Sequence, residues 1–322
     1  MISSVLSSRR SIPRRELAET SLILLIGMLS LTWFRGSSLI WGNDASVPLN
    51  LGNRIDDYLY IWSWKTAPGG VDASKFPFLL PLGFLLKLYS VFDLPFSPSA
   101  FQRITMYLLF TFSGLCAYIL FRQLVPTGSS VGRLTAALLG MFNFYSLWLF
   151  IPFPYILFRY CFFPLILALY IRGLENNKKL SYAVAIAFVW TVTMTPGYVT
   201  SPFAAIDWAV ILSFLAFHMI TRKGTGNAQR AVLFTFCLFA VWLSLNSVWI
   251  MPLVFFFHEE LFRHSIPGTD PWILYKGNSV NILDGFRLAG YGGLGGSYKG
   301  SAFYPWYEIY QTPLFILASF LM

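Results

Sequence analysis

The chain has 322 residues, and its composition excludes an ordinary soluble protein. Hydrophobic residues make up 56% of it and aromatic residues 19%, whereas only 11% are charged. A soluble domain is about a quarter charged, because its surface must face water. The long and closely spaced apolar runs instead predict an all-α, polytopic membrane protein, a transmembrane helical bundle in a single domain.

The formal net charge of +9 does not indicate nucleic acid as a partner. The basic residues lie in short breaks between apolar runs, where they orient a chain in a bilayer, and no basic and aromatic patch of the nucleic-acid type is present. The cysteines Cys116, Cys161 and Cys237 all lie inside apolar runs. We expect buried, unpaired thiols there, with neither a disulfide framework nor a metal site.

The first apolar run predicts a span over residues 17–34. Four arginines precede it, which places the N-terminus in the cytoplasm by the positive-inside rule. No small-residue cleavage site follows the run, so we interpret it as an uncleaved anchor in the cell membrane. Asp44 then emerges on the extracytoplasmic side.

Two segments of the first outer loop are predicted to be interfacial. Residues 54–65 combine Asp56, Asp57 and an arginine with several aromatic residues, which is typical of an amphipathic helix at headgroup depth. Residues 76–92 are nearly long enough to cross the membrane. If they crossed it, eight later basic residues would lie outside. If they only lie on it or re-enter, the same eight lie in cytoplasmic loops, so we favour the second reading.

The later apolar runs predict further spans that alternate in direction. The last one has only eleven residues, where about twenty are needed to cross. We therefore expect the sequence to be the N-terminal part of a longer protein, with a long extracytoplasmic loop over 258–310. Pro164 and Pro252 are expected to kink their helices. The predicted spans are 104–121, 134–151, 154–171, 180–197, 202–220, 231–257 and the incomplete 312–322.

Asp44 is the leading candidate for catalysis. It follows the outer end of the first span, where water, headgroups and protein meet, and a carboxylate there can take a proton from an acceptor hydroxyl. The alternative is a solvated loop residue or a helix N-cap. Asp56 and Asp57 are secondary acidic candidates. Because adjacent helical residues point about 100° apart, only one of the two can face a site.

Two charged residues lie close to membrane depth, Arg159 near the outer end of its span and Asp207 in the outer half of its span. Charges at that depth are costly and are usually paired or line a wet cavity. They either pair with each other, which is a structural role, or Arg159 meets an anionic ligand. The sequence leaves both alternatives open.

Two motifs in the last outer loop invite a functional reading. The sequence HEELFRH has histidines six residues apart, whereas the zinc motif HExxH needs them four apart. Arg263 and His264 suit a phosphate better, and a solvated turn is the alternative. The glycines over 290–295 match GxGxxG in letters only, because no strand precedes them. We interpret this stretch as a mobile loop or lid, with Arg287 and Lys299 as anion contacts.

Several segments together resemble one family. Their order is a first span, an acidic outer loop with interfacial helices, four patterned apolar segments and a long outer loop. This layout resembles the GT-C class of membrane glycosyltransferases, most closely the arabinofuranosyltransferase-like and related bacterial or archaeal polytopic membrane proteins. The patterned segments are 99–124, 137–150, 164–174 and 247–257.

The resemblance implies a function at the extracytoplasmic surface. The donor would be a sugar linked to a polyprenyl phosphate, the acceptor a cell-surface glycan or glycoprotein, and the general base Asp44. In this family a second acidic residue often lies close to the general base. Here the next carboxylates, Asp56 and Asp57, lie twelve and thirteen residues after Asp44. No phosphate-binding motif can be matched, so the donor-phosphate ligands are expected among Arg159, Arg263, His264 and Arg287. No cofactor is implied, and a metal requirement is left open.

A non-catalytic polytopic protein is the alternative, as a transporter-like protein, an assembly subunit or an inactive glycosyltransferase relative. A transporter typically has paired broken helices and charges at mid-membrane. This sequence has its carboxylates mainly at the interface, which favours a reaction there.

Overall fold

The computed structural model describes residues 14–36, 62–63, 70–71, 97–143, 146, 154–175, 179–194, 202–221, 225–263 and 313. Nearly all of them are helical. The helices are α2 (Arg14–Gly27), the 3-10 helix η1 (Met28–Trp33), α5 (Pro98–Leu124), α6 (Ser130–Phe142), α8 (Pro154–Glu175), α9 (Lys179–Met194), α10 (Pro202–Thr221) and α11 (Thr225–Arg263). Two strands of two residues each, β1 (Trp62–Ser63) and β2 (Gly70–Val71), pair antiparallel. Trp62 and Ser63 lie in the predicted interfacial helix 54–65 and are extended instead. The rest of that range and the predicted interfacial segment 76–92 lie outside the described residues.

These helices are those of a multi-pass membrane protein. Among the residues described, five segments are long and apolar enough to cross a bilayer, and α6 and α9 are shorter apolar helices. Many large apolar side chains on them are exposed, as expected where lipid covers a surface. The five segments are Arg14–Trp33, Ser99–Leu124, Leu157–Glu175, Phe203–Thr221 and Ala228–Ser247.

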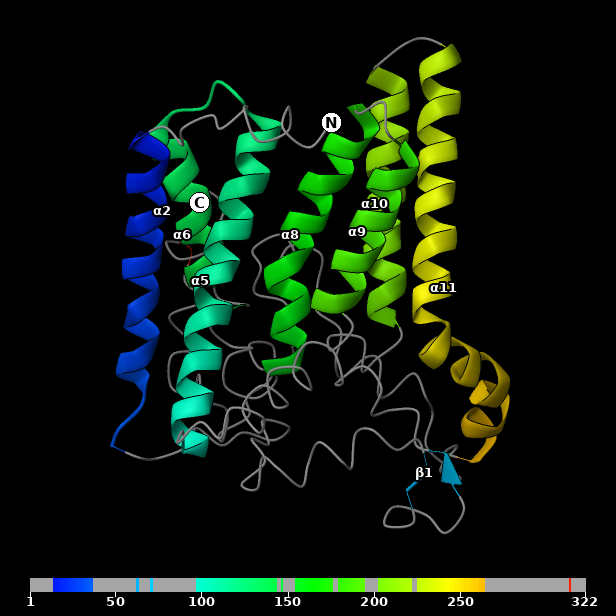
Figure 1. Cartoon of the computed structure of the whole chain (residues 1–322), viewed down its shortest axis with the longest axis horizontal. Coiled ribbons are helices and arrows are strands. Elements are labelled where there is room, and N and C mark those ends of the chain that lie inside the picture. The colour runs from blue at the N-terminus through cyan, green and yellow to red at the C-terminus, as the bar shows by residue number, and fades with distance from the viewer. Residues whose placement is uncertain are drawn as a thin grey trace, which may run out of the picture.

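The helices stand side by side and alternate in direction (Figure 1). α2 lies at one edge against α5 and α6, while α9, α10 and α11 form the other half, and α8 packs against both α5 and α9. Two buried clusters follow this division. One joins α2, Phe34 after η1, α5, α6 and α8, and the other joins α8, α9, α10 and α11. α8 therefore holds the two halves together.

Small residues let the first three helices approach closely. A Cβ on Gly27 would lie 2.0 Å from Thr111 Oγ1 of α5, and one on Gly140 of α6 would lie 2.8 Å from the carbonyl oxygen of Ser113. Such close approaches of one helix to a neighbour at a glycine are typical of helix pairs in membranes, where packing replaces the hydrophobic effect as the driving force. These glycines thus set the spacing of α2, α5 and α6.

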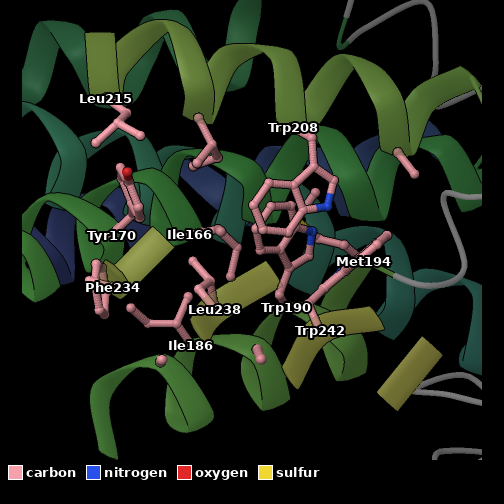
Figure 2. Close-up of a cluster of buried hydrophobic side chains, with 14 of the residues drawn as sticks. Ile166, Tyr170, Ile186, Trp190, Met194, Trp208, Leu215, Phe234, Leu238 and Trp242 are labelled. Carbon is pink, nitrogen blue, oxygen red and sulfur yellow. The ribbon is translucent and has the colours of Figure 1, made fainter. Parts of the chain in front are cut away.

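Aromatic rings fill the core of the second half. Figure 2 shows the rings of Trp190, Trp208 and Trp242 gathered between α9, α10 and α11. Trp190 and Trp208 stack with ring centroids 4.9 Å apart, and the Trp242 ring lies 5.4 Å from that of Trp208. Further along α8, Tyr170 shares a hydrogen bond of 2.7 Å with Thr235 of α11. Large rings here bury much apolar area with few degrees of freedom.

Three helices, α5, α8 and α11, are several residues longer than the sequence predicts. α8 runs over Pro154–Glu175 instead of 154–171. α5 begins at Pro98, six residues before the predicted 104, because Ser97 caps its first turn by accepting a hydrogen bond of 3.2 Å from the Ala100 N–H. α11 runs over Thr225–Arg263 instead of 231–257, so HEELFR is helical and not a turn. Its Glu, Leu and Arg residues favour helix. In Figure 1, α11 changes direction towards its C-terminal end.

Candidate functional site

Most of the predicted site residues lie outside the part of the chain that the structure describes. They are Asp44, Asp56, Asp57, His264 and Arg287. For Arg263 the structure gives the backbone only, as the last residue of α11. Arg159 is the one predicted phosphate ligand whose side-chain contacts are described.

One end of the bundle is nevertheless defined by the helices that lead into the predicted site. Phe34, which follows η1, lies under Arg103 of α5, with Cζ 5.4 Å from the ring centroid. At the opposite ends of α2 and α5, the Tyr118 hydroxyl donates a hydrogen bond of 2.5 Å to Glu19. α2 and α5 are therefore antiparallel, and residues 36 and 97 lie at the same end. The stretch 37–96, with its three candidate carboxylates, leaves and rejoins the bundle there.

An ion pair between α8 and α10 lies towards this end. Arg159 donates to Oδ1 of Asp207 from Nη2 at 2.7 Å and from Nε at 2.9 Å. Each residue is in the second turn of its helix, and α8 and α10 run in the same direction (Figure 1). Asp207 is completely buried, and the Arg159 guanidinium also lies 4.9 Å from the ring centroid of Phe203. Of the two alternatives open at the sequence level, the structure shows the pairing.

The consequence of this pair is structural. A buried carboxylate is tolerated only when a cation and hydrogen bonds compensate the water it has lost. Arg159 supplies both from a neighbouring helix and thereby sets the rotation of α10 against α8. Because two nitrogens of its guanidinium point at one carboxylate oxygen, this edge of the arginine is already engaged.

A second polar cluster lies at the other end of α2 and was not anticipated from the sequence. Glu19 is 5% exposed and accepts hydrogen bonds from Arg133 Nη2 at 3.0 Å, Arg15 Nε at 3.2 Å, Tyr118 and the Ser130 hydroxyl. The i, i+4 spacing of Arg15 and Glu19 was a readable signal. The contacts to α5 and α6 had no such signal. This cluster connects three helices and is a structural feature.

Close to the Glu19 cluster, Arg122 of α5 donates a hydrogen bond of 2.9 Å to Glu16 of α2. The Arg122 side chain is half exposed, so water competes for this contact. It is the exposed counterpart of the buried pair between Arg159 and Asp207.

Arg103 is a further residue for which the sequence contains no motif. It lies in the second turn of α5, at the end of the bundle to which the stretch 37–96 connects. Its Nε and Nη2 are buried and have no acceptor among the described residues. A sequence signal was present, since an arginine at the edge of an apolar run is typical of the membrane interface.

Cysteines and metal-binding residues add no site within the described ranges. Cys116 and Cys161 are free and buried, as predicted, whereas Cys237 is free but only partly buried. The Cys161 thiol donates to the carbonyl oxygen of Leu109 at 3.1 Å. No group of three or more His, Cys, Asp or Glu residues there is arranged to hold a metal ion.

Comparison with known proteins yields no match. No family model fits the chain, and neither a curated protein nor a solved structure is significantly similar to it.

Proposed function

We propose that this protein is an integral membrane glycosyltransferase that uses a polyprenyl-phosphate-linked sugar as donor. The acceptor is a cell-surface glycan or glycoprotein on the extracytoplasmic side, and Asp44 is the general base. The observation that carries the proposal is the antiparallel pairing of α2 and α5, which brings residues 36 and 97 to one end of a multi-pass bundle. Both ends of the stretch with the candidate acids therefore connect to one end of the bundle. The GT-C-like layout of the sequence adds further support.

The chemistry suits such a boundary. The donor keeps its isoprenoid tail in the bilayer while its anomeric carbon is at the interface. Asp44 takes the proton of the acceptor hydroxyl as that oxygen attacks the anomeric carbon, and the carbon–phosphate oxygen bond breaks. The polyprenyl phosphate leaves with the bonding electrons, and cations must stabilise its charge.

The cations of this proposal come from the last outer loop and the end of α11, namely Arg263, His264 and Arg287. Arg159 is not assigned to the donor phosphate, because the structure pairs its guanidinium with Asp207. Withdrawing Arg159 from Asp207 would take away the cation that the structure shows beside a fully buried carboxylate.

The test is sugar transfer by the purified chain in lipid vesicles. The donors are labelled pentoses and hexoses on polyprenyl phosphate, and release of polyprenyl phosphate is measured. We expect Asp44→Asn to lower the rate at least about 100-fold, which is the usual contribution of a general base. Asp56→Asn and Asp57→Asn test the secondary candidates, since each removes one negative charge from the same stretch. A larger loss in either of them than in Asp44→Asn would assign the base to that residue instead.

Full activity of the Asp44→Asn protein would remove Asp44 from the mechanism. Absence of release with every donor, from a protein that unfolds cooperatively, would favour the non-catalytic alternative.

A further inference from the structure

At one end of the bundle, the guanidinium of Arg103 has an edge that meets no acceptor among the described residues. One face of the group stacks on Phe34, itself buried, at 5.4 Å from Cζ to the ring centroid. Nε and Nη2, the two nitrogens on the same edge of the planar fork, are buried and find no hydrogen-bond acceptor in the described parts of the chain. Buried polar groups are almost always hydrogen-bonded, and an arginine edge of this kind suits two oxygens of one anion.

The carboxylates that the structure describes are engaged elsewhere. Glu16 and Glu19 bind arginines at the opposite end of α2, and Asp207 binds Arg159. Glu175 ends α8, whose first residues lie at the Arg103 end. Within the described helices, therefore, no acidic side chain serves as the counterion of Arg103.

The position of Arg103 along α5 indicates which anion is available. Arg103 and Arg122 bracket 18 residues without a charge, and they are 19 positions apart. At 1.5 Å per residue this is about 29 Å, close to the roughly 30 Å of a bilayer's hydrocarbon core. Both arginines thus lie at the depth of the headgroups, one at each boundary. Arg122 binds Glu16 at its boundary. At the Arg103 boundary no described carboxylate is close, and the headgroups of a bilayer supply phosphate.

We propose that Arg103 binds the phosphate group of a membrane lipid, with Nε and Nη2 donating to two phosphate oxygens. A phosphate accepts such a paired contact better than a single-point contact, which is why arginine is preferred at planar phosphate sites. The ligand class is a phosphate attached to an apolar tail, either a glycerophospholipid or an isoprenoid phosphate. The proposal needs only a membrane-spanning chain and is independent of the proposed sugar transfer.

The test measures lipid binding by the full chain, purified in detergent and stripped of lipid. Dioleoylphosphatidylglycerol is compared with dioleoylglycerol, and undecaprenyl phosphate with undecaprenol, so that each pair differs by the phosphate-bearing headgroup. Dissociation constants are obtained by native mass spectrometry for the wild type, Arg103→Gln, Arg103→Lys and Arg122→Gln. Arg122→Gln is the matched control, because it removes the same charge from the other boundary of the same helix.

We expect the wild type to prefer the phosphate-bearing lipids and Arg103→Gln to lose about tenfold or more in affinity for them, the usual size of a charge-assisted contact. Arg103→Lys keeps the positive charge but lacks the planar guanidinium group. We expect its loss of affinity for the phosphate-bearing lipids to be smaller than that of Arg103→Gln. Arg122→Gln should bind like the wild type. A loss for both phosphate lipids supports a general lipid-phosphate site, and a loss for undecaprenyl phosphate alone supports a site for isoprenoid phosphates.

Equal affinities of the wild type and Arg103→Gln for both phosphate lipids would overturn the proposal. An equal loss in Arg122→Gln would also overturn it, because a general effect of charge would then explain the result. If Arg103→Gln does not fold, the wild-type comparison and Arg103→Lys decide. If the wild type binds the phosphate-bearing lipids no more tightly than their phosphate-free counterparts, the proposal is refuted.

Discussion

Replacing Asp207 by asparagine should destabilise the protein far more than loss of an exposed ion pair. Asp207 is fully buried, and its Oδ1 accepts from Arg159 at 2.7 Å and 2.9 Å. Removing one partner of a buried pair costs about 3–5 kcal/mol, because the other charge is left uncompensated. In Asp207→Asn the amide oxygen still accepts a hydrogen bond, and the contact between Arg159 and the Phe203 ring at 4.9 Å remains. The expected loss is therefore at the lower end, about 3 kcal/mol.

The control is the ion pair between Arg122 and Glu16, with a separation of 2.9 Å. Its distance is similar to that of the buried pair, but the Arg122 side chain is 50% exposed and that of Glu16 is 21% exposed. Water screens such a pair, and it contributes about 0–1 kcal/mol. Glu16→Gln should therefore leave stability nearly unchanged. The comparison isolates burial as the cause.

Thermal unfolding in detergent micelles provides the assay. A thiol-reactive dye that fluoresces on reaction reports unfolding, because Cys116 and Cys161 are free and buried in the folded protein. A loss of about 3 kcal/mol should lower Tm by roughly 5–10 °C. The double variant Arg159→Met with Asp207→Leu replaces the pair by apolar side chains and should recover most of the loss.

Equal Tm values for Asp207→Asn and Glu16→Gln would refute this reasoning. A double variant as unstable as Asp207→Asn would show that the uncompensated arginine is not the source of the loss.

The remaining predictions concern Glu19, the packing of Gly27 against α5, and the membrane topology. Glu19→Gln should cost about 3 kcal/mol by the same dye assay, because its arginine partner on α6 loses a buried counterion; a loss below that of Glu16→Gln would contradict this. Gly27→Ala should cost about 2 kcal/mol, since the new methyl group would overlap Thr111 Oγ1, and adding Thr111→Ala should restore part of the stability; no recovery would point to another cause. Reporter fusions after Lys179 and after Gly70 should lie on opposite sides of the membrane, and finding them on one side would overturn the predicted topology.

The helical bundle was predictable because its signals are local. Each apolar run that the structure describes is helical, and the free, buried Cys116 and Cys161 follow from their place in those runs. Helix ends were less accurate, since Ser97 begins α5 earlier by a capping contact and α11 continues to Arg263. Where a helix begins or ends depends on a few polar contacts, and these cannot be predicted from the apolar content of a segment.

The candidate site was predictable only in part. The depth of Arg159 and Asp207 was readable, because charged residues at membrane depth stand out in an apolar run. Whether they pair was not readable, since 48 residues separate them. Arg103 is part of no sequence motif. Its contact with Phe34 and the burial of its own Nε and Nη2 become visible only in the tertiary structure. The role of Asp44 stays a prediction.

The amino-acid sequence alone therefore determines the class of this protein, a multi-pass helical bundle, because apolar content and the spacing of charges act locally on each segment. Tertiary structure alone decides which face of each helix meets which neighbour. Many side chains on the lipid side are as apolar as those in the core, so periodicity does not mark the inner face. Each residue turns about 100° around a helix, and only packing sets that rotation. The rotation of each helix about its axis therefore decides which residues contact Glu19, Asp207 and Arg103.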